Sequence, residues 1–206
     1  VLQYKKVIGL ILALFLSSIS FAQYSDEAKV DSLIRELIVL EKGEQKVDIL
    51  LEISQEYLKY DAVKSEEYAK RAYNMSADID YEMGTLRSAK KLSHVEVYYN
   101  LNYYIGLDYL ATALKIAEKR RDQNELMEIY QHFGFVKGLM QNYDEAIEYY
   151  NKAVRIAQTL GEHESLASLY SYLADVYIEK GDEKNAKNYY ARVYRMIENG
   201  KIDGTT

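Results

Sequence analysis

The chain has 206 residues, a formal net charge of −6 and no proline, cysteine or tryptophan. The lack of cysteine excludes disulfides and thiol chemistry, and the acidic balance argues against nucleic-acid binding, because a nucleic-acid-binding face is basic. Proline breaks helix interiors and glycine weakens them, so a proline-free chain with only 10 glycines favours an all-helical protein.

Residues 1–22 have the pattern of a secretory signal peptide. Two lysines precede an apolar run at 7–16, and Ser20 and Ala22 are small residues that a signal peptidase accepts. The apolar run is shorter than the roughly 20 residues of a membrane-spanning helix. We therefore expect cleavage after Ala22, export to the periplasm or cell envelope, and no membrane contact after cleavage. An uncleaved anchor is the alternative.

An amphipathic segment follows, and we expect a capping helix within 23–43. Its apolar residues recur at helical spacing and so share one face: Val30, Leu33, Ile34, Leu37 and Leu40. Gly43 is suited to ending this helix. A stripe on one face only is typical of a helix that covers the end of a larger helical array.

The stretch 126–157 predicts a helical hairpin. Two amphipathic segments flank a polar turn at 141–144, and three residues share one face of the second segment: Ala146, Tyr150 and Ala153. Gly134 and the two alanines are small enough to let the two helix axes approach closely, and the rings of Tyr130, Phe133 and Tyr150 fill the space between them. Because one hairpin cannot bury both of its faces, it needs neighbours.

The hairpin pattern recurs at an offset of 40 residues: 108–117 aligns with 148–157, and equivalent residues continue to Tyr190. This pattern resembles the tetratricopeptide repeat (TPR) family, in a longer variant of the usual ~34-residue repeat. The resemblance implies an all-α, right-handed α-solenoid of about four helical hairpins after the capping helix. We expect the array at 44–200, with repeats near 44–80, 82–120, 123–160 and 163–199, followed by a polar, loose tail at 201–206.

No pattern typical of an active site is present in the sequence. His94, His132 and His163 are far apart along the chain, and no H-E-x-x-H motif occurs. Nucleophile elbows and phosphate-binding glycine loops are absent. The alternating carboxylates at 78–82 lack the glycine of a calcium loop, because Met83 stands in its place. We therefore expect a protein that is not an enzyme, with no cofactor and no metal, and structural or surface roles for the histidines.

Tyrosine is unusually abundant, with 22 residues. Such rings could line a sugar site or an aromatic-ligand site. However, the 40-residue offset places four of them on the positions that pack between helices: Tyr130, Tyr150, Tyr170 and Tyr190. We interpret most tyrosines as core residues whose hydroxyl ends reach water.

The resemblance also predicts binding residues, because the first helix of each TPR repeat lines a concave groove. The candidates are Lys91, Val95, Tyr98, Tyr99, Glu128, Gln131, Phe135, Leu139, Ser171 and Asp175. Family members that clamp a peptide carboxylate use a lysine and asparagine array, whereas here Lys91 stands alone, so that activity is not expected. The aromatic and aliphatic candidates suit an extended or helical peptide with apolar anchors. The alternative is that this patch packs against the N-terminal helix or a continuing chain.

The sequence therefore predicts an exported, non-catalytic scaffold that binds a protein or peptide partner and no nucleic acid. The signal peptide, the tyrosine-rich repeats and the lack of a polar helix after the fourth repeat resemble periplasmic TPR regions of bacterial sensor kinases and regulators. That resemblance implies the sensor region of a larger signalling protein, continuing into a further domain. The alternative is a stand-alone envelope adaptor that forms a homo-oligomer through its uncapped C-terminal repeat. An enzyme with a tyrosine-lined sugar groove is a third reading, but the carboxylate pair of glycosidases is missing.

Overall fold

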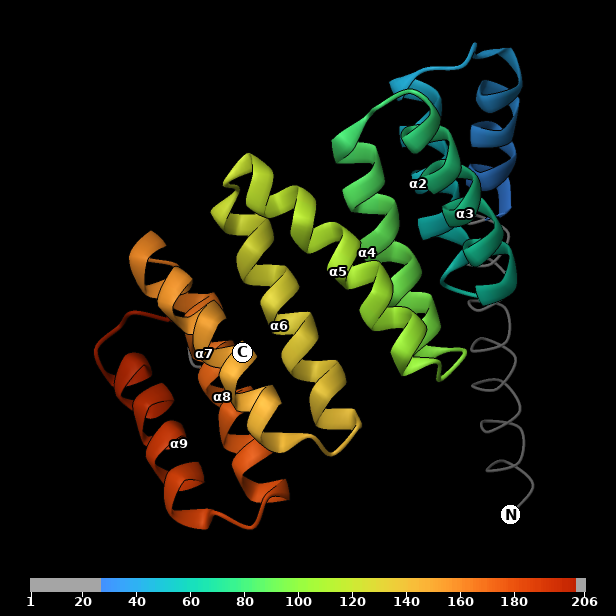
Figure 1. The fold of residues 1–206 in the computed structure, drawn as a ribbon. Coiled ribbons are helices and arrows are strands. Elements are labelled where there is room, and N and C mark those ends of the chain that lie inside the picture. The colour runs from blue at the N-terminus through green and yellow to red at the C-terminus, as the bar shows by residue number, and fades with distance from the viewer. Residues whose placement is uncertain (1–26, 203–206) are drawn as a thin grey trace, which may run out of the picture. The chain divides into compact units, whose positions relative to one another are not determined.

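A computed structural model describes residues 27–202, and all regular structure within this range is α-helical (Figure 1). The chain divides into two compact units, one ending at Gly84 and the other beginning at Thr85. The predicted signal peptide at 1–22 lies outside the described residues. Within 27–202, no helix is both long enough and apolar enough to cross a membrane.

The first unit contains a helix at 27–39, α2 (Glu44–Tyr57) and α3 (Ala62–Asp78). The predicted stripe of the 27–39 helix packs on α2 and α3 in one core of buried side chains: Val30, Leu33, Leu37, Val47, Leu50, Leu51, Ile53, Tyr57 and Ala72. The hydroxyls of Ser54 and Ser65 each donate to the other residue's carbonyl oxygen, at 2.8 Å. This reciprocal pair satisfies buried polar groups where α2 and α3 approach closely.

The second unit holds most of α4 (Glu82–Tyr98), then α5 (Tyr103–Arg120), α6 (Gln123–Leu139), α7 (Tyr143–Leu160), α8 (His163–Glu179) and α9 (Glu183–Glu198). Helices α6 and α7 pair as one hairpin and α8 and α9 as the next, with α7 packed against α8. Their core is built around the small and large side chains that the sequence pattern places on facing surfaces: Ala146, Tyr150, Ala153, Ala157, Ala167, Leu169, Tyr170 and Leu173.

The turns between helices recur about every 20 residues, and this spacing produces the 40-residue repeat. Residues with left-handed backbone conformation stand at Arg121, Gln141, Gly161 and Gly181, with φ between 55° and 85°. Glycine adopts this conformation without steric cost, whereas arginine and glutamine do so at a cost of about 1 kcal/mol each. Asp122 caps α6, because its side-chain carboxylate accepts the backbone N–H of Glu125 at 3.2 Å.

The C-terminal tail differs from the sequence expectation. Ile202, in the segment expected to be loose, is only 7 % exposed and packs into the core of the second unit. The physical reason is the turn at Gly200, whose φ of 63° reverses the chain after α9. The backbone N–H of Lys201 then donates to the carbonyl of Met196 at 2.9 Å, and the next side chain, the apolar Ile202, is buried.

Gly134 and Tyr150 make the predicted close contact between α6 and α7. A Cβ atom at Gly134 would lie 2.9 Å from two ring carbons of Tyr150, whereas a Cβ at Gly138 would meet nothing nearer than Val176 at 3.8 Å. The Tyr150 ring is only 2 % exposed and packs in the core of the second unit. Gly134 is therefore required by packing, and Gly138 is not.

We predict that Gly134→Ala lowers the free energy of unfolding by about 1–3 kcal/mol, because the added methyl group overpacks the Tyr150 ring. Gly138→Ala, on the same helix, is the matched control and should be neutral or stabilising by up to about 1 kcal/mol, because alanine favours helix. Urea unfolding followed by circular dichroism measures both changes. Equal stability of the two variants would contradict the close contact.

Candidate functional site

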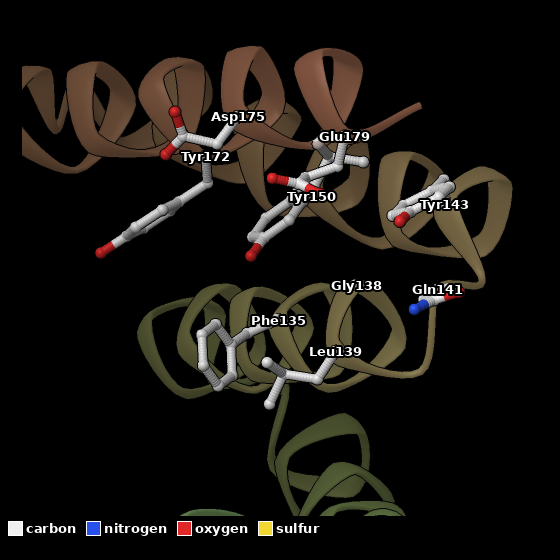
Figure 2. Close-up of a pocket in the computed structure, with 10 residues that line it drawn as sticks. Phe135, Gly138, Leu139, Gln141, Tyr143, Tyr150, Tyr172, Asp175 and Glu179 are labelled. Carbon is white, nitrogen blue, oxygen red and sulfur yellow. The ribbon is translucent and has the colours of Figure 1, made fainter. Parts of the chain in front are cut away.

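A hollow of about 480 Å³ lies between α6 and α8, with α7 at its base (Figure 2). We call it the aromatic hollow, because rings make up much of its lining: Phe135, Gly138, Leu139, Gln141, Tyr143, Tyr150, Tyr172, Asp175, Val176 and Glu179. Three of the candidates predicted from sequence are among these residues, namely Phe135, Leu139 and Asp175. The structure therefore brings predicted positions from two different repeats to one cavity.

The rings of this region are arranged in stacked pairs. Tyr150 and Tyr172 have ring centroids 5.7 Å apart, and Tyr98 stacks on Phe135 at 5.1 Å. Burial raises the pKa of the Tyr150 hydroxyl, and the nearby Tyr172, Tyr98 and Asp175 raise that pKa further. The Tyr150 side chain is therefore a neutral hydroxyl at physiological pH, able both to donate and to accept a hydrogen bond.

A second hollow, of about 230 Å³, is basic. We call it the basic hollow, and it is lined by Arg87, Lys90, Lys91, His94 and His132. Lys90 makes ion pairs with Glu125, at 2.7 Å, and with Glu128. Burial lowers the pKa of Lys90, but its hydrogen bonds to the two carboxylates outweigh burial and leave that pKa raised. Burial alone lowers the pKa of Lys91.

The two hollows belong to one groove. A small hollow between them is lined by His94, Tyr98, His132 and Phe135 among others, so it shares Phe135 with the aromatic hollow and both histidines with the basic hollow. The groove thus runs along α4, α6 and α8, which are the first helices of consecutive hairpins.

His94 and His132 lie together, which reasoning from the sequence missed. Their separation of 38 residues is three short of the 41-residue offset between the starts of α4 and α6, so they lie about one helical turn out of register on the same groove-lining face. Burial, reinforced by Lys90, lowers the pKa of His132 to about 4. Burial and Lys91 lower the pKa of His94. Both imidazoles are therefore neutral at pH 7.

Val95 is wrongly placed by the sequence reasoning. It is fully buried, because the groove-lining face of α4 carries His94 and Tyr98 and the neighbouring face packs into the core. Tyr98 and Tyr99 are both exposed, and their rings lie 4.4 Å and 6.2 Å from that of His94.

The other candidates have local partners or partial exposure. Glu128 is held by Lys90, and the Ser171 hydroxyl donates to the Ala167 carbonyl one turn earlier, at 3.2 Å. Gln131 is half-buried. Within residues 27–202, no cluster of three or more histidine or carboxylate residues has an arrangement that could hold a metal ion.

The paired helices, their regular turns and the groove along the first helices define an α-hairpin repeat protein. Residues 125–199 match the family model of the tetratricopeptide repeat. The match covers the two hairpins α6–α7 and α8–α9, where the sequence pattern is clearest.

Solved structures share this fold. BtubC (BKLC) from P. vanneervenii is 20% identical and superposes with a TM-score of 0.78 over 90% of this chain and 78% of that one. The apo form of RapI is 16% identical, with a TM-score of 0.77 over 91% of this chain and 69% of that one. A Rap protein complexed with competence and sporulation factor is 19% identical, with a TM-score of 0.71 over 89% of this chain and about half, 52%, of that one.

These likenesses establish the all-α, TPR-type solenoid fold that the sequence predicts, and at such identities they show the fold alone. A search by sequence among curated proteins gave no match.

The lowered pKa of His132 predicts that stability falls in acid. In the unfolded chain the imidazole takes up a proton near pH 6.5, whereas in the folded protein it does so only near pH 4. The unfolded state therefore binds more protons between these values, and stability present above pH 6.5 is lost as the pH falls towards 4. We expect a loss on the order of 2 kcal/mol that His132→Gln removes.

Unfolding free energies measured from pH 7 to pH 4, together with NMR titration of the imidazoles, test this expectation. His163→Gln is the matched control, because His163 is exposed on α8. The assignment fails if the difference between the wild type and His132→Gln does not change with pH.

Proposed function

We propose that this protein is a non-catalytic scaffold that binds an extended or helical segment of a protein partner along α4, α6 and α8. The observation that carries the proposal is the row of hollows with shared lining residues, with the aromatic hollow at one end and the basic hollow at the other. A concave, largely apolar site with a few polar groups at defined places is the usual form of a recognition site. Separate pockets along one groove match the alternating anchors of a peptide segment.

The repeat family supports a binding role without catalysis, because TPR arrays generally serve as protein-interaction scaffolds. A Rap protein of the same fold has been solved in complex with competence and sporulation factor, which is a precedent for ligand binding by this fold. We expect no nucleic-acid partner, since the net charge is −6 and the groove also carries carboxylates.

Phe135 is the residue through which we test the groove, because it lines two of its hollows and stacks on Tyr98. We predict that Phe135→Glu reduces partner capture at least tenfold, because it places a charge in an apolar contact surface. Affinity purification from the native organism with quantitative mass spectrometry measures the captured partner. Tyr98→Ala should weaken capture in the same direction.

Val63→Glu provides the matched control, because Val63 is an exposed apolar residue of α3 outside these hollows. Circular dichroism must show both glutamate variants folded. Equal capture by the wild type, Phe135→Glu and Val63→Glu would remove the groove from consideration as the binding site.

A second candidate function follows from the outer face of α9. Offset by 40 residues, it corresponds to a buried face of α7: exposed Tyr190, Tyr194 and Ile197 stand where Tyr150, Val154 and Ala157 are covered. A covered face in one hairpin and an exposed one in the next favour docking of a further helix there. We propose, as the alternative, an envelope adaptor whose copies associate through this face.

We also propose export of the protein, on the signal-peptide pattern at 1–22, to the periplasm or cell envelope. A finer form of the proposal is that the groove belongs to the sensor region of a larger bacterial signalling protein, on the resemblance of the tyrosine-rich repeats to such regions.

The masses of the native protein distinguish these alternatives. We predict that the mass of the denatured protein corresponds to a chain whose first residue is Gln23. We also predict that the native mass, measured by light scattering, equals that of one copy. A mass beyond that of residues 23–206 would identify the continuing chain of a sensor protein. A native mass of two or more copies that Tyr194→Lys reduces to one would favour the adaptor, and an N-terminus that retains residues 1–22 would contradict cleavage.

A further inference from the structure

We propose that the aromatic hollow binds a cationic side chain, arginine or lysine, of the partner segment. This inference rests on the groove being the binding site, and it specifies the chemistry of one position in the ligand. Four observations support it: the ring faces, the carboxylates at the rim, the Tyr150 hydroxyl and the lack of a cation in the lining.

The ring faces of the hollow are suited to a cation. Elsewhere in the protein, tyrosine rings make cation–π contacts with lysine and arginine side chains. Lys152 lies 4.8 Å from the centre of the Tyr149 ring, and Arg192 lies 4.9 Å from the centre of the Tyr189 ring. In contrast, no lysine, arginine or histidine is among the described residues that line the aromatic hollow. A guanidinium or ammonium group over an aromatic face is attracted by the negative face of the ring, more strongly where water is partly excluded.

Two carboxylates stand at the rim one helical turn apart, on Asp175 and Glu179 of α8 (Figure 2). Neither makes an ion pair within the described part of the chain, and Asp175 accepts a hydrogen bond from the Tyr190 hydroxyl. Carboxylates near this site do pair where a cation is within reach, as Glu145 does with Lys137 at 2.7 Å. The hollow therefore combines negative charge with aromatic walls, and a cation from the ligand would complement both.

Tyr150 provides a polar group inside the hollow. Its side chain is only 2% exposed, and its hydroxyl points into the cavity (Figure 2). Among residues 27–202, this hydroxyl has no hydrogen-bond partner. It is placed to accept an N–H from a guanidinium or ammonium group, which would satisfy a polar atom at the base of the site.

An acidic or purely aliphatic ligand side chain fits this hollow less well. A carboxylate would face Asp175 and Glu179, and an aliphatic chain would leave the Tyr150 hydroxyl without a hydrogen-bond partner and the two rim carboxylates without a counter-ion. The basic hollow at the other end of the groove has the opposite charge, so it favours an acidic residue of the same segment. The charge order along α4, α6 and α8 would therefore set the direction in which a segment binds.

The test uses the full chain from residue 23 and a displayed library of random 12-residue peptides, selected on the wild type and counter-selected on Phe135→Glu. Synthetic versions of the selected peptides are then compared with versions in which one arginine becomes citrulline, or one lysine becomes N-acetyl-lysine. We expect neutralisation of one conserved position to weaken binding about tenfold, measured by fluorescence anisotropy.

Protein variants locate that effect in the hollow. Glu179→Gln and Tyr172→Leu should each weaken the cationic peptide about threefold to tenfold and leave its neutral version unchanged. Glu164→Gln is the matched control, because it removes the same charge from an exposed position of α8 outside the hollow.

The outcomes separate the two proposals. Peptides that depend on Phe135 but tolerate neutralisation of every cation would overturn the cationic site and leave the groove proposal standing. Peptides whose cation matters, but equally in the wild type and in Glu179→Gln and Tyr172→Leu, would place the cation elsewhere and also overturn this inference. If no selected peptide binds the wild type more tightly than it binds Phe135→Glu, both the groove proposal and the cationic site are overturned.

Discussion

The contact between Tyr150 and Gly134 determines how α6, α7 and α8 come together. The ring occupies the space that a Cβ on α6 would need, and it also stacks on Tyr172 of α8. One side chain therefore sets the approach of α7 to the helix before it and to the helix after it. Because the same ring forms the base of the aromatic hollow, the packing of the core and the shape of the groove depend on one residue.

The 20-residue spacing of the turns has a further consequence for function. It returns each first helix to the same register, so residues about 40 apart in sequence line one surface. Phe135 of α6 and Asp175 of α8 meet in this way, and His94 and His132 lie together about one helical turn out of that register. A repeat protein builds a site from equivalent positions rather than from a local motif, which explains why no motif search reveals it.

Charge is distributed unevenly along this groove. Lys90 is held by two carboxylates at the basic end, while Asp175 and Glu179 stand among rings at the other end. The histidines between them are neutral at pH 7, because burial disfavours their protonation. In the proposed binding role, such an arrangement would discriminate among partners by the order of charges and by apolar anchors.

The sequence by itself determined the helices, their lengths and the places of close packing. The period of apolar residues, the small residue at Gly134 and the cap at Asp122 are local signals, because each acts within one or two helical turns. Only the tertiary structure decided which face of each helix reaches the groove. On α4, packing buries Val95 and directs its neighbour His94 to the groove, and a single turn at Gly200 returns Ile202 to the core. Those outcomes depend on how neighbouring helices rotate to fill a shared volume, which is a property of the packed array and not of any one segment.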